Sequence, residues 1–422
     1  EGSPEKLRYA LAYGADAVYA GIPRFSLRAK ENPYNNNSLK EDIEYCYSMD
    51  KKMYVTANIL PPNRKLESFK KSIATIAEAE PDGVIMSDPG MIQYVRKEFP
   101  SLAVHLSVQT NTINWMSVAF WRDHGIKRII LSRELSIQEL QEIHTQVPDM
   151  ELESFVHGSI CIAYSGRCLL SNYFNHRDAN QGTCTNSCRW EYNVQQEVPE
   201  GEQKTKSPEG NFFIEEKGRG GDLMPIDEDE HGTYIMNSKD LRAIEHIDEL
   251  WNAGVESFKI EGRTKSIYYL SLITKTYRKA IDSMVASKPF DPELLRETEK
   301  TANRGFTTAF LLSGASRATE RFDSPQEENL PQIYAGQIIN ERAGNWIEVD
   351  VKNRIEIGCE MEYISPQNNY RFRITSMESD SGMALKVAHG GNGSVWMKME
   401  GPVDPFALLS RVVDSSVPSS VS

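Results

Sequence analysis

The sequence predicts an α/β protein: a parallel (β/α) TIM-like barrel followed by a small antiparallel β-barrel domain. Short apolar strand candidates alternate with helical segments, and several of them follow a glycine suited to closing a helix. Seven or eight such units without a dinucleotide-binding fingerprint favour a barrel over a doubly wound sheet. The strand candidates are residues 14–20, 53–57, 83–86, 103–108, 125–131, 151–156, 234–236 and 254–260, and a helix is predicted over 241–251.

The first element is a helix rather than a strand. Ser3 is placed to cap this helix and Pro4 fits its first turn. Its apolar stripe consists of Leu7, Ala10 and Leu11. A (β/α) barrel begins with a strand, so we expect this barrel either to be incomplete or to lack its first strand, which would then precede Glu1.

The chain divides into a barrel, a polar insertion and a β-rich domain. Its 422 residues predict two domains at about 150 residues each. Residues 1–194 and 233–315 are assigned to the barrel, and the Pro-, Gly-, Glu- and Lys-rich residues 195–232 to an insertion at one end of it. The hydrophobic period changes to two after about residue 330, so residues 331–412 are predicted to form the small antiparallel barrel or sandwich.

Charge and hydropathy limit the partners. The 60 acidic and 47 basic residues leave a net charge of −13, which argues against a protein whose whole surface binds polyanions. Any nucleic acid must therefore meet a local basic patch. No stretch predicts a membrane span or a secretory signal, and we expect a cytoplasmic protein. The candidate basic pairs are Arg64–Lys65, Lys70–Lys71, Lys127–Arg128 and Arg278–Lys279, each of which alone is more often a solvated helix face.

Four of the six cysteines lie close together, just past a predicted barrel strand, at the end of the barrel where such folds carry their chemistry. They are Cys161, Cys168, Cys184 and Cys188, with 6, 15 and 3 residues between them. The wide first gap fits the close ligand pairs of zinc sites poorly, whereas an iron–sulfur cluster tolerates it. Four unrelated buried thiols are the alternative. Cys46 and Cys359 are interpreted as packing residues.

The segment around the first two of these cysteines resembles the signature of the collagenase-like peptidase family U32. The matching run is ESFVHGSICIAYSGRCLLS at residues 153–171. Two further blocks, YGADAVYAG at 13–21 and KIEGR at 259–263, are similar to the same family. The blocks that resemble its tRNA-hydroxylating branch are residues 86–90, 105–109, 132–136, 180–193 and 229–242.

The resemblance implies a tRNA-modifying enzyme that forms 5-hydroxyuridine at the wobble position. In that branch the reaction is linked to prephenate, a dicarboxylate co-substrate, and to iron–sulfur assembly. Members of the family carry a four-iron cluster on cysteines, so the implied ligands of a 4Fe–4S cluster are Cys161, Cys168, Cys184 and Cys188. The tRNA anticodon arm would meet the protein through a local basic patch.

Polar residues at the ends of the strand candidates are the expected lining of a pocket. Lys259, Glu261 and Arg263 alternate onto one side of an extended run, and Thr264 and Ser266 can cap the helix that follows. Together with Arg133 they are predicted to clamp a dicarboxylate or an RNA phosphate. A salt bridge between Glu261 and Arg263 that closes the barrel mouth is an equal alternative. The other strand-end residues are Asn58, Ser87, Asp88, His105, Gln109, Glu134, Asn237 and Ser238.

Two other functions stay open. One is peptide hydrolysis, although no HExxH or GxSxG motif occurs and a cysteine held by iron cannot also act as a nucleophile. The other is a cluster-bearing scaffold that binds tRNA without catalysis. His157 is a candidate general base, but a lone histidine at a strand end is more often structural. Aromatic residues near the cysteines are candidates for stacking on an extruded base, or for core packing: Tyr164, Tyr173, Phe174 and Trp190.

Overall fold

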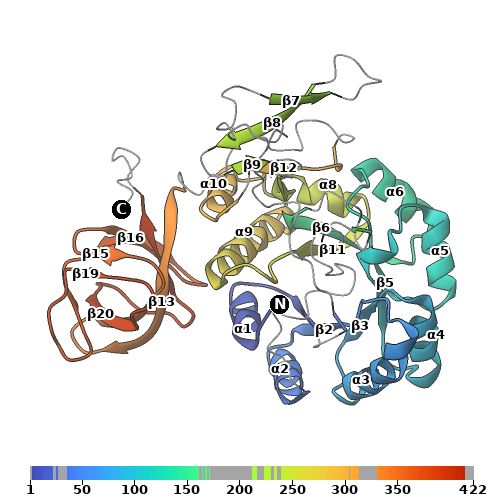
Figure 1. The fold of residues 1–422 in the computed structure, drawn as a ribbon, viewed down its shortest axis with the longest axis horizontal. Helices are drawn as coiled ribbons and strands as arrows, with labels where there is room; N and C mark the ends of the chain where they lie inside the picture. The colour runs from blue at the N-terminus through green and yellow to red at the C-terminus, as the bar shows by residue number, and fades with distance from the viewer. Residues whose placement is uncertain are drawn as a thin grey trace, which may run out of the picture.

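A computed structural model gives the fold of the chain (Figure 1). It describes residues 2–21, 25, 26, 36–160, 164, 167, 168, 171, 212–215, 223–229, 232–234, 239–303, 305–312 and 330–413. Among these residues no helix is both long enough and apolar enough to cross a membrane.

The first described element is helix α1 (Pro4–Ala12), as the sequence predicts. The Ser3 side chain accepts a hydrogen bond from the Lys6 backbone N–H, and Pro4 occupies the first turn. The predicted apolar stripe of α1 is buried, and it belongs to the main hydrophobic core. The sequence therefore places both the start of this helix and its buried face correctly.

Six parallel strands follow one another around the main sheet, each hydrogen-bonded to the next. They are β1 (Ala17–Gly21), β2 (Lys52–Thr56), β3 (Gly83–Met86), β4 (Val104–Leu106), β5 (Arg128–Ile130) and β6 (Glu151–Ser159). The helices between them are α2 (Asn36–Ser48), α3 (Leu66–Glu78), α4 (Pro89–Glu98), α5 (Trp115–Asp123) and α6 (Ile137–Gln146). This alternation, with short and almost fully buried strands, confirms the predicted α/β class.

The sheet continues beyond β6 in a pattern that the sequence does not predict. Strand β11 (Val255–Ile260) pairs with β6 in parallel, whereas β10 (Asp240–Arg242) pairs with β6 antiparallel and with β12 (Phe306–Thr307) in parallel. The predicted helix over 241–251 is therefore wrong at its start, because Leu241 lies in β10. The helical part is a 3-10 turn, Ile244–His246, followed by α8 (Ile247–Asn252). The apolar residues from Leu241 onward have helical spacing, but backbone hydrogen bonds to β6 hold Leu241 in a strand.

The ring of strands is open between β1 and β11. In the described part of the chain β1 pairs with β2 and β11 with β6, and neither pairs with the other. A cleft of about 520 Å³ lies between them, lined by both strands and by helix α9 (Ile267–Val285). This agrees with the expectation that the barrel is incomplete or lacks its first strand.

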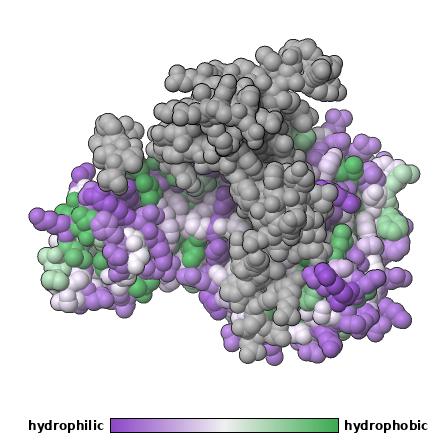
Figure 2. All heavy atoms as spheres, viewed as in Figure 1, coloured by the Kyte–Doolittle hydropathy of each residue, from purple (hydrophilic) through white to green (hydrophobic). Residues whose placement is uncertain are grey.

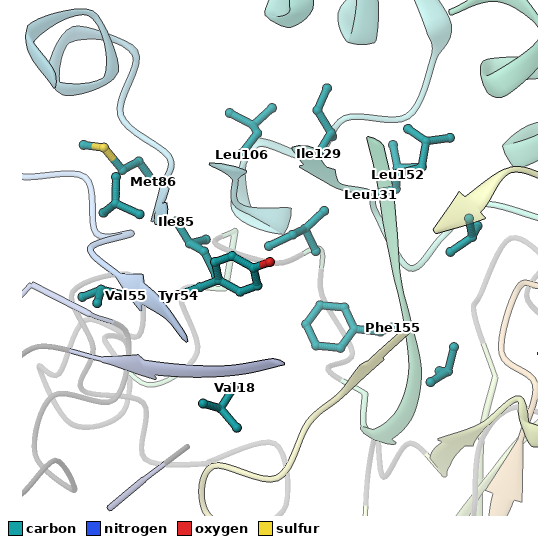
Figure 3. Packing of buried hydrophobic residues seen from close by; sticks show 14 of the residues in the cluster. Val18, Tyr54, Val55, Ile85, Met86, Leu106, Ile129, Leu131, Leu152 and Phe155 are labelled. Carbon is teal, nitrogen blue, oxygen red and sulfur yellow. The ribbon is translucent and has the colours of Figure 1, made fainter. Parts of the chain in front are cut away.

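The main core fills the space inside and around this sheet (Figure 3). Val55, Met86, Leu106 and Leu152 are fully buried. The rings of Tyr54 and Phe155 point toward one another across the interior (Figure 3). Cys46 lies fully buried in this core, as expected of a packing residue.

Part of the polar insertion forms strands. β7 (Phe212–Glu215), β8 (Leu223–Asp229) and β9 (Gly232–Tyr234) make a three-stranded antiparallel sheet. The predicted strand at 234–236 lies only partly within β9, because residues 235–238 fall outside the described part.

The C-terminal part is an antiparallel β-structure, as predicted from the period-two pattern. Its larger sheet contains β13 (Gln332–Arg342), β14 (Trp346–Val351), β16 (Glu360–Ile364), β17 (Asn369–Arg373), β18 (Met377–Glu378), β20 (Ser394–Lys398) and β21 (Leu408–Val412). A short pair consists of β15 (Ile355–Glu356) and β19 (Val387–Ala388). Cys359 packs at the edge of its core. Small groups of hydrophobic residues break the mostly hydrophilic surface over these strands (Figure 2).

The C-terminal strands dock on helices α1 and α9 through a mixed interface. Tyr13, Tyr268 and Ile364 belong to one buried apolar cluster there. The Tyr13 hydroxyl lies 2.9 Å from the Ile364 carbonyl oxygen, to which it donates. Buried Lys275 donates to the Ser365 carbonyl oxygen and to Asn369 Oδ1. Hydrogen bonds that satisfy buried polar groups fix the two parts in one arrangement.

Candidate functional site

The carboxyl ends of the parallel strands meet at one end of the barrel, and the cysteine-bearing segment begins there. Cys168, half-buried, is the one of the four predicted ligands that lies among the described residues; Cys161, Cys184 and Cys188 lie outside them. The described part holds no group of three or more His, Cys, Asp or Glu side chains arranged for a metal ion.

Arg133 lies beside the end of β6. Its guanidinium is stacked on the Phe155 ring, 3.8 Å from the centroid, and its Nη1 donates to the Ser159 carbonyl oxygen at 2.9 Å. Its Nε is buried and has no hydrogen-bond partner among the described residues. A buried N–H of a guanidinium without an acceptor is costly, so Arg133 retains an unused donor for an anion or a carbonyl oxygen.

Lys259 points into the barrel rather than toward its mouth. The Lys259 Nζ lies 2.6 Å from Glu153 Oε1 and 4.2 Å from the centroid of the Tyr19 ring. Ser257 and Arg128 bind the other oxygen of the Glu153 carboxylate. Burial by itself raises the pKa of Glu153, but Lys259 and Arg128 outweigh it and hold this pKa below its ordinary value. Lys259 is thus part of an internal ion-pair cluster, apart from the predicted clamp.

Glu261 lies against the end of β6. Its backbone N–H donates to the His157 carbonyl oxygen at 2.9 Å. Gly158, with φ +118°, permits this approach, because a Cβ there would lie 2.8 Å from Glu261. The Glu261 carboxylate accepts from the Tyr19 hydroxyl at 3.4 Å and from the Arg263 backbone N–H at 3.2 Å. Glu261 therefore links β6, β1 and the turn after β11.

Arg263 is buried, with 8% of its surface exposed. Its Nη2 donates to Ser26 Oγ at 2.9 Å, and its carbonyl oxygen accepts from Lys6. β11 ends at Ile260, so the three predicted clamp residues do not share one face of a continuous strand. They instead lie along β1, where Lys259 and Glu261 contact Tyr19. Ser266 caps α9 by accepting from Tyr269 N–H, as predicted.

His157 is buried away from solvent, with 1% of its surface exposed. The Tyr277 hydroxyl donates to the Val156 carbonyl oxygen at 2.7 Å, so its contact with His157 Nδ1 at 3.2 Å is one in which the histidine donates. Nε2 is then the unprotonated nitrogen, and no described residue forms a hydrogen bond with it. Burial lowers the pKa of His157 to about 3, so the ring is neutral at neutral pH. Its role as a base stays a prediction.

Three other predicted strand-end residues form one polar group. Ser87 Oγ lies 3.1 Å from Gln109 Oε1 and 3.1 Å from the Asn58 carbonyl oxygen, and these two acceptors share its single hydroxyl hydrogen. Asn58 Nδ2 donates to Ser107 Oγ at 3.2 Å. These side chains come from the ends of β2, β3 and β4, so the parallel sheet brings them together as the sequence predicts.

The remaining strand-end residues lie in different places and make different contacts. Asp88 caps α4 by accepting from Met91 N–H, and Glu134 accepts from the Ser132 hydroxyl. His105 lies inside β4, where its ring packs 4.7 Å from that of Tyr54 and burial lowers its pKa to about 3. Asn237 and Ser238 lie outside the described residues.

The predicted basic pairs lie in different places. Arg64 and Lys65 are in a 3-10 turn at the carboxyl end of β2, the end that also carries Cys168. Lys127 and Arg128 are at the opposite end, where β5 begins, and Arg128 is paired with Glu151 and Glu153. The other two pairs are on α3 and α9, where Lys70 is paired with Glu67 and Arg278 with Asp16 and Asp282.

Several residues of this region are absent from the sequence predictions. Glu153 and Tyr19 are two of them, although an acidic residue inside an apolar strand is a signal of a buried ion pair. Asn111 and Arg167, which form a hydrogen bond at 3.1 Å between Oδ1 and Nε, are absent from those predictions too. Tyr164 is 48% exposed, while Tyr173, Phe174 and Trp190 lie outside the described residues.

A barrel-like α/β fold with polar side chains and a cysteine-bearing segment at the carboxyl ends of its strands defines a class of proteins whose chemistry lies at that end. Residues 2–321 match the model of peptidase family U32, and residues 331–410 match its C-terminal domain. The chain belongs to peptidase family U32, which confirms the resemblance seen in the sequence.

Relatives of known name extend over nearly the whole chain. The chain is 46% identical to tRNA hydroxylation protein P of Escherichia coli (strain K12) over 430 residues, covering 97% of this chain and 95% of that protein. It is 44% identical to tRNA hydroxylation protein P of Haemophilus influenzae over 434 residues, with 97% and 94% covered. It is also 28% identical to the 23S rRNA 5-hydroxycytidine C2501 synthase of Escherichia coli, covering 90% of this chain and 54% of that protein.

Proposed function

We propose that this protein hydroxylates tRNA and forms 5-hydroxyuridine at the wobble position. The observation that carries the proposal is its similarity, over 97% of the chain, to two proteins named for tRNA hydroxylation. A third relative is named for 5-hydroxycytidine synthesis in another RNA, which favours chemistry at C5 of a pyrimidine. Strands β1 to β6 and β11 are parallel, so their carboxyl ends lie at the same mouth, where a splayed-out base can enter.

We place a 4Fe–4S cluster on Cys161, Cys168, Cys184 and Cys188. Thiolates are the usual ligands of such clusters, and the half-buried position of Cys168 at the carboxyl end of the barrel suits a group reached from the mouth. Replacing C5–H of uracil by C5–OH is a two-electron oxidation that needs both an oxygen donor and a terminal electron acceptor as co-reactants. A cluster held by these cysteines would supply electron transfer between the base and that acceptor.

We assign the dicarboxylate co-substrate, prephenate, to the same mouth, next to Arg133. What supports this is the buried Nε donor of Arg133, which no described residue accepts from and which is held in place by the Phe155 ring and the Ser159 carbonyl oxygen. Arg263 and Glu261 are assigned to shaping the wall of this site, since both are held by contacts to β1 or the residues after it. Lys259 does not line this wall; we assign it to stabilising the strands behind it through its ion pair with Glu153.

The experiment is deletion of the gene, followed by mass spectrometry of tRNA nucleosides. We expect 5-hydroxyuridine and its derivatives to disappear, and to return with the intact gene or a Cys46→Ala copy but not with a Cys168→Ala copy. Anaerobically purified protein should hold about four iron atoms per chain, and the Cys168→Ala variant should lose them. Unchanged nucleosides in a clean deletion, with cleavage of gelatin by the purified protein, would establish the peptidase instead.

A further inference from the structure

We infer that Tyr164 and Arg167 form an RNA-contacting turn at the mouth of the barrel, in which Arg167 binds a backbone phosphate and Tyr164 stacks on a neighbouring base of a single-stranded loop. The identity of the RNA rests on the proposed function. The inference adds the part of the protein surface that binds this RNA. Below, "the Tyr164–Arg167 turn" means these two residues.

The turn joins an aromatic ring and a guanidinium on one exposed feature. The Arg167 backbone N–H donates to the Tyr164 carbonyl oxygen at 3.0 Å, which holds the two residues next to each other. Tyr164 is 48% exposed, and Arg167 is exposed as well. Single-stranded RNA is commonly held by this combination, because every base has a face on which a ring can stack and a cation can meet the adjacent phosphate.

Asn111 holds the turn on the rigid part of the barrel. Asn111 ends the 3-10 turn Val108–Thr110 after β4 in the left-handed conformation, with φ 49°, which asparagine tolerates better than most residues. Its Nδ2 donates to the Val108 carbonyl oxygen at 3.3 Å, and its Oδ1 accepts from Arg167 Nε at 3.1 Å. Arg167 is therefore pre-positioned by a side chain that is itself fixed.

The hydrogen bond to Asn111 uses Nε and leaves the outer edge of the guanidinium for a ligand. No described residue pairs with Nη1 or Nη2 of Arg167. Two other arginines at this end differ: Arg263 is buried against Ser26, and Arg133 is stacked on Phe155. A guanidinium held at one nitrogen loses less side-chain freedom when it binds a phosphate, so the contact is stronger than that of a free surface arginine.

The location matches the proposed chemistry. Arg167 immediately precedes Cys168, one of the proposed cluster ligands, so a phosphate bound there places the adjacent base near the mouth. The chain carries a net charge of −13, so approach of an RNA depends on such local cations.

The test measures binding of an anticodon stem-loop to the intact, iron-loaded protein at several salt concentrations. Arg167→Ala should raise Kd roughly five- to tenfold and reduce the slope of log K against log salt by about 1. Tyr164→Ala should raise Kd at least fivefold, whereas Tyr164→Phe, which keeps the ring, should not. Asn111→Gly tolerates the left-handed backbone and keeps the Arg167 charge, so it should weaken binding without changing the slope. Lys97→Ala, an exposed cation in the last turn of α4, is the matched control and should have no effect.

Each contrary result overturns the inference. Equal Kd and slope for wild type and Arg167→Ala would show that the turn does not bind RNA, while the hydroxylation proposal would stand on the wild-type protein. If Arg167→Ala binds RNA normally but needs a higher concentration of the dicarboxylate for half-maximal rate, Arg167 belongs to the small-molecule site. If the wild-type protein binds no stem-loop and leaves tRNA unmodified, both proposals fail.

Discussion

Arg263 packs its guanidinium directly over Gly21. A Cβ built on Gly21 would overlap Arg263 Nη2 and Ser26 Oγ, so the absence of a side chain at the end of β1 is what admits the arginine. β1 and β11 are not hydrogen-bonded to each other in the described part of the chain. The side chain of Arg263, in the turn after β11, thus contacts β1, although no backbone hydrogen bonds join the two strands in the described part.

The first prediction concerns this contact. Gly21→Ala should displace the end of Arg263 from Ser26 and reduce tRNA modification at least tenfold, while the melting temperature falls by only a few degrees, because the displaced atoms are the flexible end of a side chain. Modification in cell extracts and thermal unfolding measure the two effects. Gly90→Ala is the control, since a Cβ there meets only Asp88 Oδ1 at 3.3 Å. Normal activity of the Gly21→Ala variant would exclude Arg263 from the site.

Residue patterns predict most of the barrel units well, because most of these strands and helices have a local signal in the sequence. α1 is an example: its cap, its first-turn proline and its buried stripe are all visible in the sequence. β10 is the counterexample, because Leu241 has helical spacing to its neighbours but pairs with β6, which is distant in the chain. A long-range ladder of this kind has no local signal.

The candidate site is predicted in part for the same reason. Strand ends locate Ser87, Asn58 and Gln109 correctly, since parallel strands end on one edge. Side-chain direction is not given by position: Lys259 turns inward to Glu153, and His157 is enclosed by aromatic rings. Such directions depend on which partner charge or ring is nearby, and that is a property of the packed structure.

The second prediction concerns the internal ion pair. Lys259→Met should destabilise the fold by about 3–5 kcal/mol, because it leaves the buried Glu153 carboxylate with less compensation. The double variant Lys259→Met/Glu153→Gln should recover a large part of this loss, since no net charge is then left uncompensated. Urea unfolding of the single and double variants measures both values. A double variant no more stable than Lys259→Met would show that the pair does not act as one unit.

The third prediction concerns pH. Burial lowers the pKa of both His105 and His157 to about 3 from the ordinary 6.5, so below pH 6.5 the unfolded chain binds protons that the folded chain does not. Stability is therefore complete above about pH 6.5 and should fall toward pH 3, by up to about 1.4 kcal/mol per pH unit for each histidine.

Urea unfolding at pH 7, 6 and 5 tests this slope. His105→Gln and His157→Gln should each reduce it by about one proton, and His389→Gln, at an exposed position, should leave it unchanged. An unfolding free energy that stays constant between pH 7 and 5 would mean that these rings are protonated or exposed in the folded state.

The last prediction concerns the electrostatic approach of tRNA. Of the four basic pairs in the sequence, Arg64–Lys65 lies at the carboxyl end of β2, on the side of the barrel where we place the site, and Arg64 is exposed. Arg64→Glu should weaken tRNA binding roughly tenfold near 0.1 M salt and lower its salt dependence, because one phosphate contact is replaced by a repulsion. Lys127→Glu reverses an exposed charge at the opposite end of the barrel and should change neither quantity by more than twofold. The measurement compares the tRNA affinities of these two variants and their salt dependence. The comparison is matched because both variants alter the net charge of −13 by the same amount. Equal losses would mean that total charge, and not the mouth of the barrel, governs the encounter.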